Sequence, residues 1–541
     1  MLRLGPFLGM AGKQHAAYLK PEYLQYALDV DFSRGTLAPM RTDRLVSTEA
    51  VGNTIWLENC CLKWYPTCTN ITRDTMGCER IFATGVPGHD YPVHARPDDW
   101  CAGNLCRLGW PCFTVPPDVG YGAMPVTDRK AEKRTYVYTY VNAFGEESPP
   151  SPPSDLVLVD YYQSATISGF QEPEPEFCAQ RLRIYSLIAG VENGNQQTGA
   201  DNDEFYLVAD LPANTLIYTH SPLNDIPGEM LMTDRFAGVP ADARDLSHWG
   251  TNQLVFLSGN LVKFTEPWNY SVAPMKYDYE PKFSPVRLVA TQQYAYVLTC
   301  ASPEVIDLKK DCEQGGCHAG AVLDDRYPIV GRQSAATHQE GVVYASTEGL
   351  VLLVGPRAVL LTAELFTQAQ WDALQPQTMR GAVHNGYYYG ATDTSTFRIE
   401  LPGSGRSGMA EKMSYLSIRP TAWYVTSDNR LLYADATGTH EVGQGDSFKR
   451  YKAQSKLQVG PRDEIMGAIR LHSGCGDVKI TQKIAGQVCA HFSYSLTLDG
   501  STSYRLPRLR TGEFEYEFEG TAEITTVIFA RSFREISELG A

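Results

Sequence analysis

Apolar and polar positions alternate in the second quarter of the chain. Between residues 135 and 141 three tyrosines alternate with valine and threonine, the period of two that a strand with one buried face requires. Short runs of the same kind follow at 182–185, 205–209 and 215–218, separated by turns rich in Pro, Gly, Asn or Asp. Four such strands predict an immunoglobulin- or fibronectin-like β-sandwich. We place it at residues 129–235.

The first of these strands is followed by a proline-rich segment, Pro149-Pro150-Ser151-Pro152-Pro153. One interpretation is a ligand for a polyproline-binding domain. The other, which we favour, is an edge strand that its prolines block from further pairing.

Beyond residue 240 a second pattern recurs, in which a polar turn precedes three or four apolar residues and a second short strand. Measured between Gln253, Gln293, Gly341, Gly386 and Arg430, the steps are 40, 48, 45 and 44 residues. These steps are close to the length of a β-propeller blade. We therefore predict a propeller at 236–450 and leave the number of blades open.

One helix interrupts the repeats. Thr367-Gln368-Ala369-Gln370 is a capping box, in which a Thr and a Gln three residues apart satisfy free backbone groups at a helix start. Trp371 and Leu374 follow as apolar positions, and Pro376 ends the helix.

The remaining segments show weaker patterns. Residues 1–45 look like an extended N-terminal arm, and Gly5, Pro6 and Gly9 break up the apolar run that a secretory signal needs. Residues 46–128 are rich in Cys, Pro, Gly and Trp with poor periodicity, so we predict a loop-rich, Cys-rich insertion and assign it no fold. Residues 451–541 contain β-type runs. The fold class is therefore mainly β.

Composition agrees with several β domains and narrows the function. The 541 residues include 31 Tyr, 46 Gly and 33 Pro, which favours strands and turns. The net charge is −15 and no run of Lys or Arg forms a basic stripe, which argues against tight nucleic-acid binding. The sequence contains no stretch of 18 apolar residues, so it predicts no membrane-spanning helix.

Cysteine is unusually concentrated. Seven of 13 cysteines fall between Cys60 and Cys112. Their spacing lacks the paired Cys-x2-Cys arrangement of structural zinc sites, so disulfides, free thiols and a metal all stay open, with disulfides favoured. A second group, Cys312 and Cys317 with His318, could ligate a metal, but a polar loop with a disulfide fits it better.

Motifs for chemistry are few. Gly403-Ser404-Gly405-Arg406-Ser407-Gly408 matches a dinucleotide-binding pattern, but its flanks look like strands, so a hairpin loop is the better interpretation. The oxygens of Asp201-Asn202-Asp203-Glu204 could hold calcium, yet the remaining ligands of a calcium loop are missing, so we expect a solvated turn. We assign no catalytic, cofactor-binding or metal residues and no cofactor, and expect no enzymatic activity.

Four segments carry a family resemblance. The most specific is Tyr138–Pro153, where a tyrosine-rich strand runs into Gly-Glu-Glu-Ser-Pro-Pro-Ser; the others are 258–267, 361–376, and Tyr451 with Ser455-Lys456. Together they resemble the tail nozzle proteins, or tail tubular proteins B, of short-tailed, podovirus-type bacteriophages. Residues 46–128 depart from the family pattern.

The resemblance implies a structural virion protein. It implies a ring of identical subunits, six in the family, that extends the DNA ejection channel below the portal and its head-to-tail adaptor ring, with tail fibres as further partners. The tail would be assembled in the host cytoplasm. Six copies would carry 6 × −15 = −90, a charge that disfavours binding of passing viral DNA to the channel wall; the same acidity could equally serve solubility alone.

Two other classes stay open. A propeller glycoside hydrolase would use paired carboxylates, but no repeated Ser-x-Asp-x-Gly box occurs. A host-receptor-binding tail protein would show fibre-like repeats or an exposed aromatic platform.

Two structural expectations follow from the pattern. Several cysteines between Cys60 and Cys112 should be paired in mature particles. The arm to about Arg41 and the strands after Tyr451, such as 523–529, should lie at contacts with other subunits or the adaptor, where strand edges can be paired. Deleting residues 1–41 should then leave a folded propeller.

Overall fold

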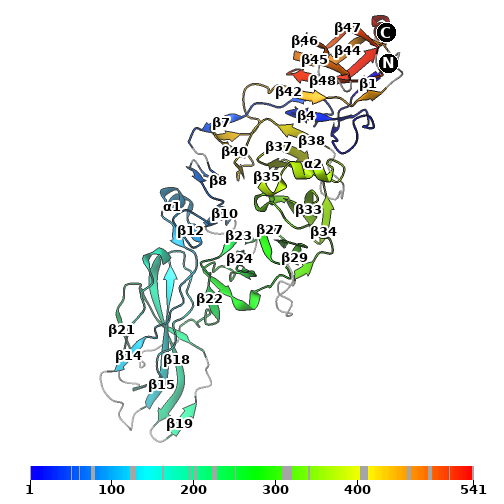
Figure 1. Cartoon of the computed structure of the whole chain (residues 1–541). Helices are drawn as coiled ribbons and strands as arrows, with labels where there is room; N and C mark the ends of the chain where they lie inside the picture. Colours follow the sequence, from blue (N-terminus) through cyan, green and yellow to red (C-terminus); the bar gives the residue numbers. More distant parts are fainter. Residues whose placement is uncertain are drawn as a thin grey trace. The chain divides into compact units, whose positions relative to one another are not determined.

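The structure is a computed structural model of the chain (Figure 1). It describes residues 2–49, 52–59, 61–74, 79–121, 130–160, 164–193, 196–199, 204–221, 228–249, 252–307, 320–338, 341–402, 412–459, 465–484, 490–510 and 512–538. Two compact units are present, and each is described by itself. The first comprises Met1–Cys68, Phe283–Val305 and Ala321–Ala541, and the second Thr69–Lys282 and Ile306–Gly320.

The first unit contains a series of small antiparallel sheets of the propeller type. They are β27 (Pro285–Ala290) with β28 (Tyr294–Thr299), β29 (Glu304–Asp307) and β30 (Gly320–Val322); β31 (Ala336–His338), β32 (Gly341–Ala345), β33 (Leu350–Val354) and β34 (Arg357–Leu360); β35 (Arg380–His384), β36 (Tyr387–Ala391), β37 (Thr396–Glu400) and β38 (Met413–Leu416); β39 (Ala422–Val425), β40 (Leu431–Asp435) and β41 (Gly438–Glu441) with β7 (Arg44–Ser47); and β8 (Thr54–Glu58) with β9 (Cys61–Tyr65).

The first strands of these sheets lie side by side in the order β27, β31, β35, β39, β8. Strand meanders that adjoin through their first strands are the blades of a β-propeller. The β-propeller prediction is therefore confirmed as the fold class. The blades are stabilised by burial, because their second strands, such as Gly341–Ala345, are buried along their whole length.

The five sequence repeats mark the second strands of five blades. The repeat positions near 253, 293, 341, 386 and 430 coincide with the starts of β24 (Gln253–Ser258), β28, β32, β36 and β40. This strand carries the apolar run because it has a neighbour on each side.

The second unit contains two further small sheets. One is β10 (Asn70–Arg73), β11 (Ile81–Thr84), β12 (Val93–Ala95) and β13 (Cys106–Arg107), followed in part by α1 (Pro97–Ala102); the other is β23 (Arg244–Trp249), β24 and β25 (Leu261–Phe264). Both β10 and β11 lie against β23. Strands β22 (Phe236–Gly238) and β26 (Val272–Pro274) pair beside them.

Residues 46–128 are rich in loops and cysteines as predicted, but the interpretation that the segment has no regular fold is wrong. It holds β8 to β13, arranged as sheets of the same kind as the blades. These strands are only two to five residues long, and polar residues and cysteines interrupt them. Runs this short give too few positions for a period of two to be recognised.

The sandwich prediction holds in the second unit. One sheet consists of β14 (Asp118–Tyr121), β17 (Ala165–Ser168) and β21 (Ile217–His220). The other consists of β16 (Val157–Asp160), β15 (Lys130–Asn142), β18 (Ala179–Asn193) and β19 (Gln196–Gly199), and β20 (Tyr206–Pro212) also pairs with β18. A short 3-10 turn, η1 (Pro175–Phe177), precedes β18. Tyr136, Tyr138 and Tyr140 lie in the core. Val137 on the opposite face is also buried, so β15 is covered on both sides.

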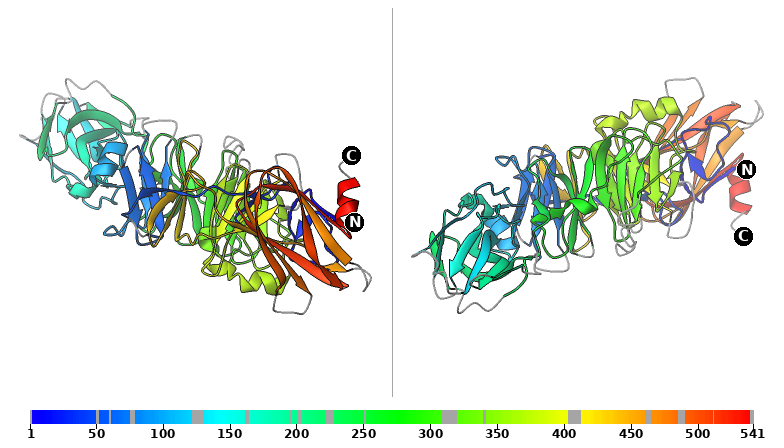
Figure 2. Two further views of the ribbon diagram at one scale, coloured as in Figure 1. Left: turned by 90° about the horizontal axis from the view of Figure 1, so that it is seen from above. Right: turned by 90° about the horizontal axis from the view of Figure 1, so that it is seen from below.

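The C-terminal region forms a second sandwich in the first unit. One sheet is β1 (Leu2–Leu4), β49 (Ile524–Ala530), β44 (Ile465–Ser473) and β47 (Ser501–Arg510); the other is β42 (Tyr451–Gln454), β48 (Glu513–Gly520), β45 (Gly476–Ile484) and β46 (Ala490–Leu498), with β43 (Gln458–Val459) on β48. Figure 2 shows these long strands near the C-terminal helix α3 (Phe533–Glu538). Tyr516 stacks on Phe529 at 4.0 Å, which joins the two sheets.

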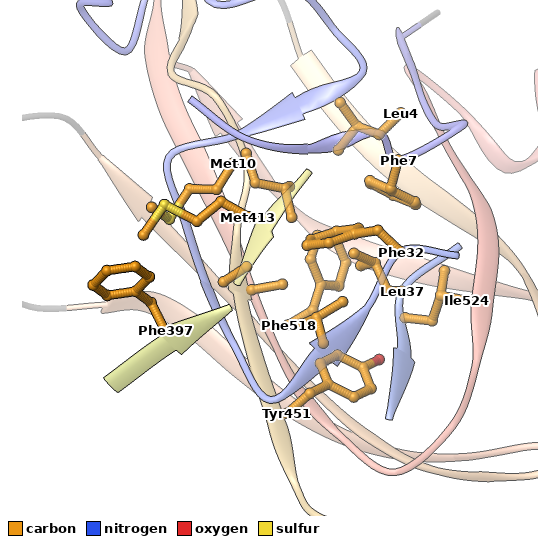
Figure 3. Close-up of a cluster of buried hydrophobic side chains, with 14 of the residues drawn as sticks. Leu4, Phe7, Met10, Phe32, Leu37, Phe397, Met413, Tyr451, Phe518 and Ile524 are labelled. Atoms are coloured by element: carbon orange, nitrogen blue, oxygen red, sulfur yellow. The ribbon is translucent and has the colours of Figure 1, made fainter. Parts of the chain in front are cut away.

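The N-terminal arm is part of this unit rather than a free extension. Strand β4 (Tyr26–Leu28) lies between β38 and β42, and β1 pairs with β49. Within the arm, β2 (Gly9–Met10) pairs with β3 (Tyr23–Leu24) and β5 (Val30–Asp31) with β6 (Ala38–Pro39). Phe7 and Leu37 are almost wholly buried, and Figure 3 shows Leu37 beside Ile524. The arm and residues 523–529 pair with each other within the chain, so this pairing needs no other subunit; their place at subunit or adaptor contacts stays a prediction.

The predicted helix is also present. α2 (Gln368–Ala373) begins after Thr367, whose side chain accepts from the Gln370 N–H while the Gln370 side chain accepts from the Thr367 N–H. Trp371 is buried and donates to the Ser346 carbonyl at 2.9 Å. Short 3-10 turns occur at Met275–Tyr277, Arg332–Ser334 and Pro376–Thr378.

Candidate functional site

The turn that follows β15 forms a buried polar junction in the second unit. The turn Asn142–Glu146 ends β15, and the Asn142 side-chain oxygen accepts from the N–H groups of Phe144 and Glu146. Gly145 has φ +82°, a conformation that few other residues adopt without strain. The Glu146 side chain is buried, and its carboxylate also accepts from the Asn142 side-chain amide.

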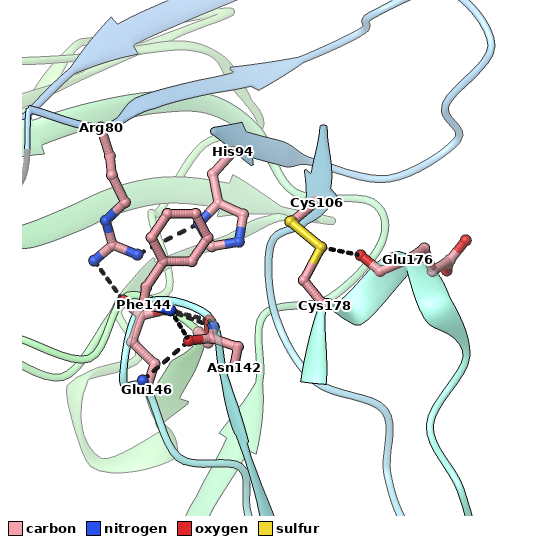
Figure 4. Close-up of a disulfide and its surroundings, with 9 residues drawn as sticks. Arg80, His94, Cys106, Asn142, Phe144, Glu146, Glu176 and Cys178 are labelled. Carbon is pink, nitrogen blue, oxygen red and sulfur yellow. Dashed lines mark hydrogen bonds and ion pairs between the residues drawn. A yellow bond between two sulfur atoms is a disulfide. The ribbon is translucent and has the colours of Figure 1, made fainter. Parts of the chain in front are cut away.

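Glu146 is held there as a carboxylate. Its Oε1 lies 2.7 Å from an Arg80 Nη and accepts from the Tyr270 N–H, and its Oε2 accepts from Ser271 Oγ at 2.6 Å (Figure 4). Burial raises the pKa of Glu146, but the Arg80 charge and these hydrogen bonds lower it by more, to about 2. The carboxyl group is therefore ionised at neutral pH.

Aromatic rings enclose the cation of this pair. The Arg80 guanidinium lies 4.6 Å from the Phe144 ring centre and 4.7 Å from that of Tyr270. His94 lies beside it, and burial together with the Arg80 charge outweighs the attraction of Glu146, so the pKa of His94 falls to about 3. His94 is neutral at physiological pH, and one cation faces one anion in the junction.

A disulfide lies next to this junction. Cys106 on β13 is bonded to Cys178, which follows η1 in the sandwich (Figure 4). An ion pair accompanies the bond, because Arg107 donates to Glu176 at 2.8 Å and Tyr91 donates to the other oxygen of that carboxylate at 2.8 Å. Covalent and polar contacts therefore tie the β10–β13 sheet to the sandwich.

The thiol prediction is only partly met. Cys106 is paired, but its partner Cys178 lies outside the cluster. Cys61, Cys68 and Cys112 are free thiols, so the prediction of several pairs is wrong for these three; Cys60 and Cys78 lie outside the described residues. The segment folds as sheets, and its cysteines sit on different strands and turns. Sequence gives no signal for a partner 72 residues away.

The proline-rich segment lies against the edge of β15. Three serines of this segment each make two hydrogen bonds to one residue of β15. The serine N–H donates to the β15 carbonyl, and the serine Oγ accepts from the β15 N–H, with donor–acceptor distances of 2.8–3.1 Å. The serines thereby replace the hydrogen bonds that the intervening prolines cannot make. The pairs are Ser148 with Tyr140, Ser151 with Tyr138, and Ser154 with Tyr136. The segment is thus occupied within the chain, as the edge-strand interpretation expects.

The segments 258–267 and 361–376 and the start of the C-terminal sandwich are also used for packing. Gly259 forms the turn between β24 and β25, and Thr265 Oγ1 accepts from the Leu254 N–H within the same blade. The segment 361–376 contains the capped helix α2. In the C-terminal sandwich Tyr451 donates to the Ala522 carbonyl at 3.0 Å, and Ser455 Oγ accepts from the Tyr516 N–H.

The first unit also contains two open cavities. One, of about 720 Å³, is lined by polar and aromatic residues that include Asp31, Arg41, Arg398 and Phe448. Arg398 is mostly buried and donates to Asp31 at 2.9 Å, so its charge is already neutralised. The other, of about 490 Å³, is lined in part by the stacked rings of Tyr26 and Tyr415. Neither cavity was predicted from the sequence.

The structure says little about the remaining candidate motifs. Residues 201–203, 312–318 and 403–408 lie outside the described residues. Among the residues that are described, no group of three or more His, Cys, Asp or Glu side chains could hold a metal ion. Within the same residues no helix is long and apolar enough to cross a bilayer.

Comparisons with known proteins add little. No protein-family profile and no curated protein matches the sequence. Similar solved structures include Kluyveromyces lactis Hsv2, with 11% identity over 55% of this chain and 90% of that one and a TM-score of 0.26. Apo AztD from Citrobacter koseri shows 8% identity over 72% and 99%, with a TM-score of 0.24. Similarity this low carries no argument, and the fold rests on the strand order above.

Proposed function

We propose that the chain is a structural component of a short-tailed phage virion, a nozzle subunit that extends the DNA ejection channel below the portal and adaptor. The observation that carries the proposal is that all four segments resembling the nozzle family have architectural uses in this chain. They form a buried ion-pair turn, a blade hairpin, a capped helix and a strand start in the C-terminal sandwich.

The chemistry of the most family-like segment favours a structural use over a catalytic one. Glu146 is 2% exposed at its side chain and Arg80 4%, so no substrate reaches either group. Ser148, Ser151 and Ser154 are buried, and their hydroxyl oxygens accept from backbone N–H groups of β15. The buried polar groups of this segment are therefore bonded within the fold and are not presented to a substrate.

The proposal includes six copies around a channel and contact with the adaptor ring and tail fibres. The net charge of −15 per chain supports a wall that a polyanion passes without lasting contact. No enzymatic step is part of the function.

The decisive experiment is to image particles of the phage that encodes the chain, labelled with an antibody against it. We expect the label on the portal axis, and six-fold density below the adaptor in averaged images. Label on peripheral spikes would instead support a receptor-binding protein. Turnover of a polysaccharide by the purified chain, abolished by one carboxylate substitution, would support a hydrolase.

A further inference from the structure

Strand β46 is an open edge in the described part of the chain. It is the last strand of the ten-stranded sheet, and its nine residues, Ala490–Leu498, pair only with β45. Ser493, Tyr494 and Ser495 are exposed in succession, so none of the described segments covers this edge at its centre. A row of unpaired backbone donors and acceptors is available there.

This edge lacks the features that normally keep an exposed strand single. Ala490–Leu498 contains no Pro, Lys, Arg, Asp or Glu. The next strand, β47, is also paired on one side only, but it contains Pro507 together with Arg505, Arg508 and Arg510. Prolines and charges are the usual protection of edge strands. β47 has this protection and β46 does not.

The two faces of β46 differ in polarity. Phe492, Tyr494 and Leu496 point to the same face as Ile480 and Val478, the buried residues opposite Tyr494 and Leu496 on β45. Phe492 and Leu496 are only partly buried, and Tyr494 is 42% exposed. The core of the sandwich is therefore incompletely covered along this strand, which a further strand would correct.

The sequence of β46 matches itself when reversed. In an antiparallel pair of two β46 strands with Tyr494 at the centre, Ser493 faces Ser495 and Phe492 faces Leu496. Polar residues then meet polar ones and apolar residues meet apolar ones. A one-residue slip in register would break this match.

We infer that β46 pairs antiparallel with β46 of a second copy of this chain, so that the two C-terminal sandwiches share one continuous sheet across a two-fold axis. The contact is isologous: each copy offers the same strand to the other. It differs from the contacts of a six-fold ring and does not rest on the proposed function.

The test uses the full chain and four variants, with mass measured by light scattering after gel filtration at several concentrations. We expect the wild type to form a dimer of 2 × 60.0 = 120 kDa. Ser493→Lys/Ser495→Lys places lysines opposite lysines in the dimer, and should raise the dimer dissociation constant at least about tenfold. Ser493→Glu/Ser495→Glu should have the same effect.

Mixing the two variants is the critical step. Each lysine would then face a glutamate of the other copy, so an equimolar mixture should recover the dimer, with both proteins in it. Ser417→Lys/Ser427→Lys adds the same charge at exposed positions in bends and turns elsewhere in the first unit and should dimerise like the wild type.

Three results would overturn the inference. They are a wild type that stays monomeric at every concentration, a dimer or ring that the β46 lysines leave unchanged, and lysine and glutamate variants that do not combine. The second of these would leave the proposed nozzle intact, because a ring can form through other surfaces. Thermal unfolding of each variant shows whether it is folded.

Discussion

Arg80 and Glu146 form an ion pair at 2.7 Å inside the second unit, with both side chains almost wholly buried. Arg80 directly precedes β11, and Glu146 belongs to the turn after β15, so the pair joins a propeller-type sheet to the sandwich. Removal of one partner leaves the other charge buried and uncompensated, which is more costly than the loss of a surface pair.

We therefore predict that Glu146→Gln destabilises the second unit by about 3–5 kcal/mol. Hydrogen exchange of the peptides that contain β11 and β15 measures this locally, which is appropriate for a chain of several domains. Glu172→Gln, at an exposed position of the same unit, is the control and should change exchange little. Equal exchange in the two variants would show that the pair is not a stabilising contact.

The same pair predicts a dependence on pH. The pKa of Glu146 is about 2 in the folded chain and 4.5 ordinarily, so the unfolded state takes up the proton first. The ionised carboxylate stabilises the fold fully above about pH 4.5, and this contribution, roughly 3 kcal/mol, is lost as the pH falls towards 2. The difference in stability between wild type and Glu146→Gln should shrink over that interval. A difference that stays constant from pH 7 to pH 2 would contradict the assigned pKa.

The disulfide gives a third prediction. Non-reducing peptide mapping should recover Cys106 linked to Cys178, with Cys61, Cys68 and Cys112 as free thiols. Cys178→Ser should cost the second unit about 2–4 kcal/mol, because the bond restrains the unfolded chain. Cys112→Ser, at an exposed free thiol, should cost little. If Cys106 proved to be bonded to another cysteine of the cluster, the arrangement of the junction would be wrong.

The elements that sequence revealed are those whose pattern is long enough to read. β15 has thirteen residues, and the second strands of the blades carry runs of apolar residues because they are buried in the middle of their sheets. The capping box before α2 is a local signal, because its two hydrogen bonds join residues three positions apart. Each of these signals lies within one short segment.

The contacts that sequence did not reveal join segments far apart. Leu4 faces Val527 in a strand pair, and Cys106 meets Cys178 across domains. The buried pair of Arg80 and Glu146 is likewise absent from any local pattern, since each residue looks like a surface charge in its own segment. β10 to β13 are too short to show a period at all. Tertiary pairing, rather than local propensity, decides these features.

The N-terminal arm supplies the last prediction. Leu4, Phe7 and Leu37 are each at most 1% exposed and belong to the largest core cluster of the first unit, with Ile524, Val527 and Phe529 of β49. β4 also fills the place between β38 and β42 in the ten-stranded sheet. The C-terminal sandwich therefore lacks part of its core and one strand when the arm is removed.

Deletion of residues 2–41 should therefore give an aggregated or protease-sensitive chain, not a folded propeller. Phe7→Ala tests the same contact within the intact chain, and should cost about 3–5 kcal/mol because it removes a wholly buried ring. Tyr18→Ala, in the same arm but 81% exposed, should unfold at the wild-type temperature. Thermal unfolding and limited proteolysis of β44 to β49 measure both effects. A truncated chain that stays soluble, with these strands as resistant as in the wild type, would place the arm outside the core.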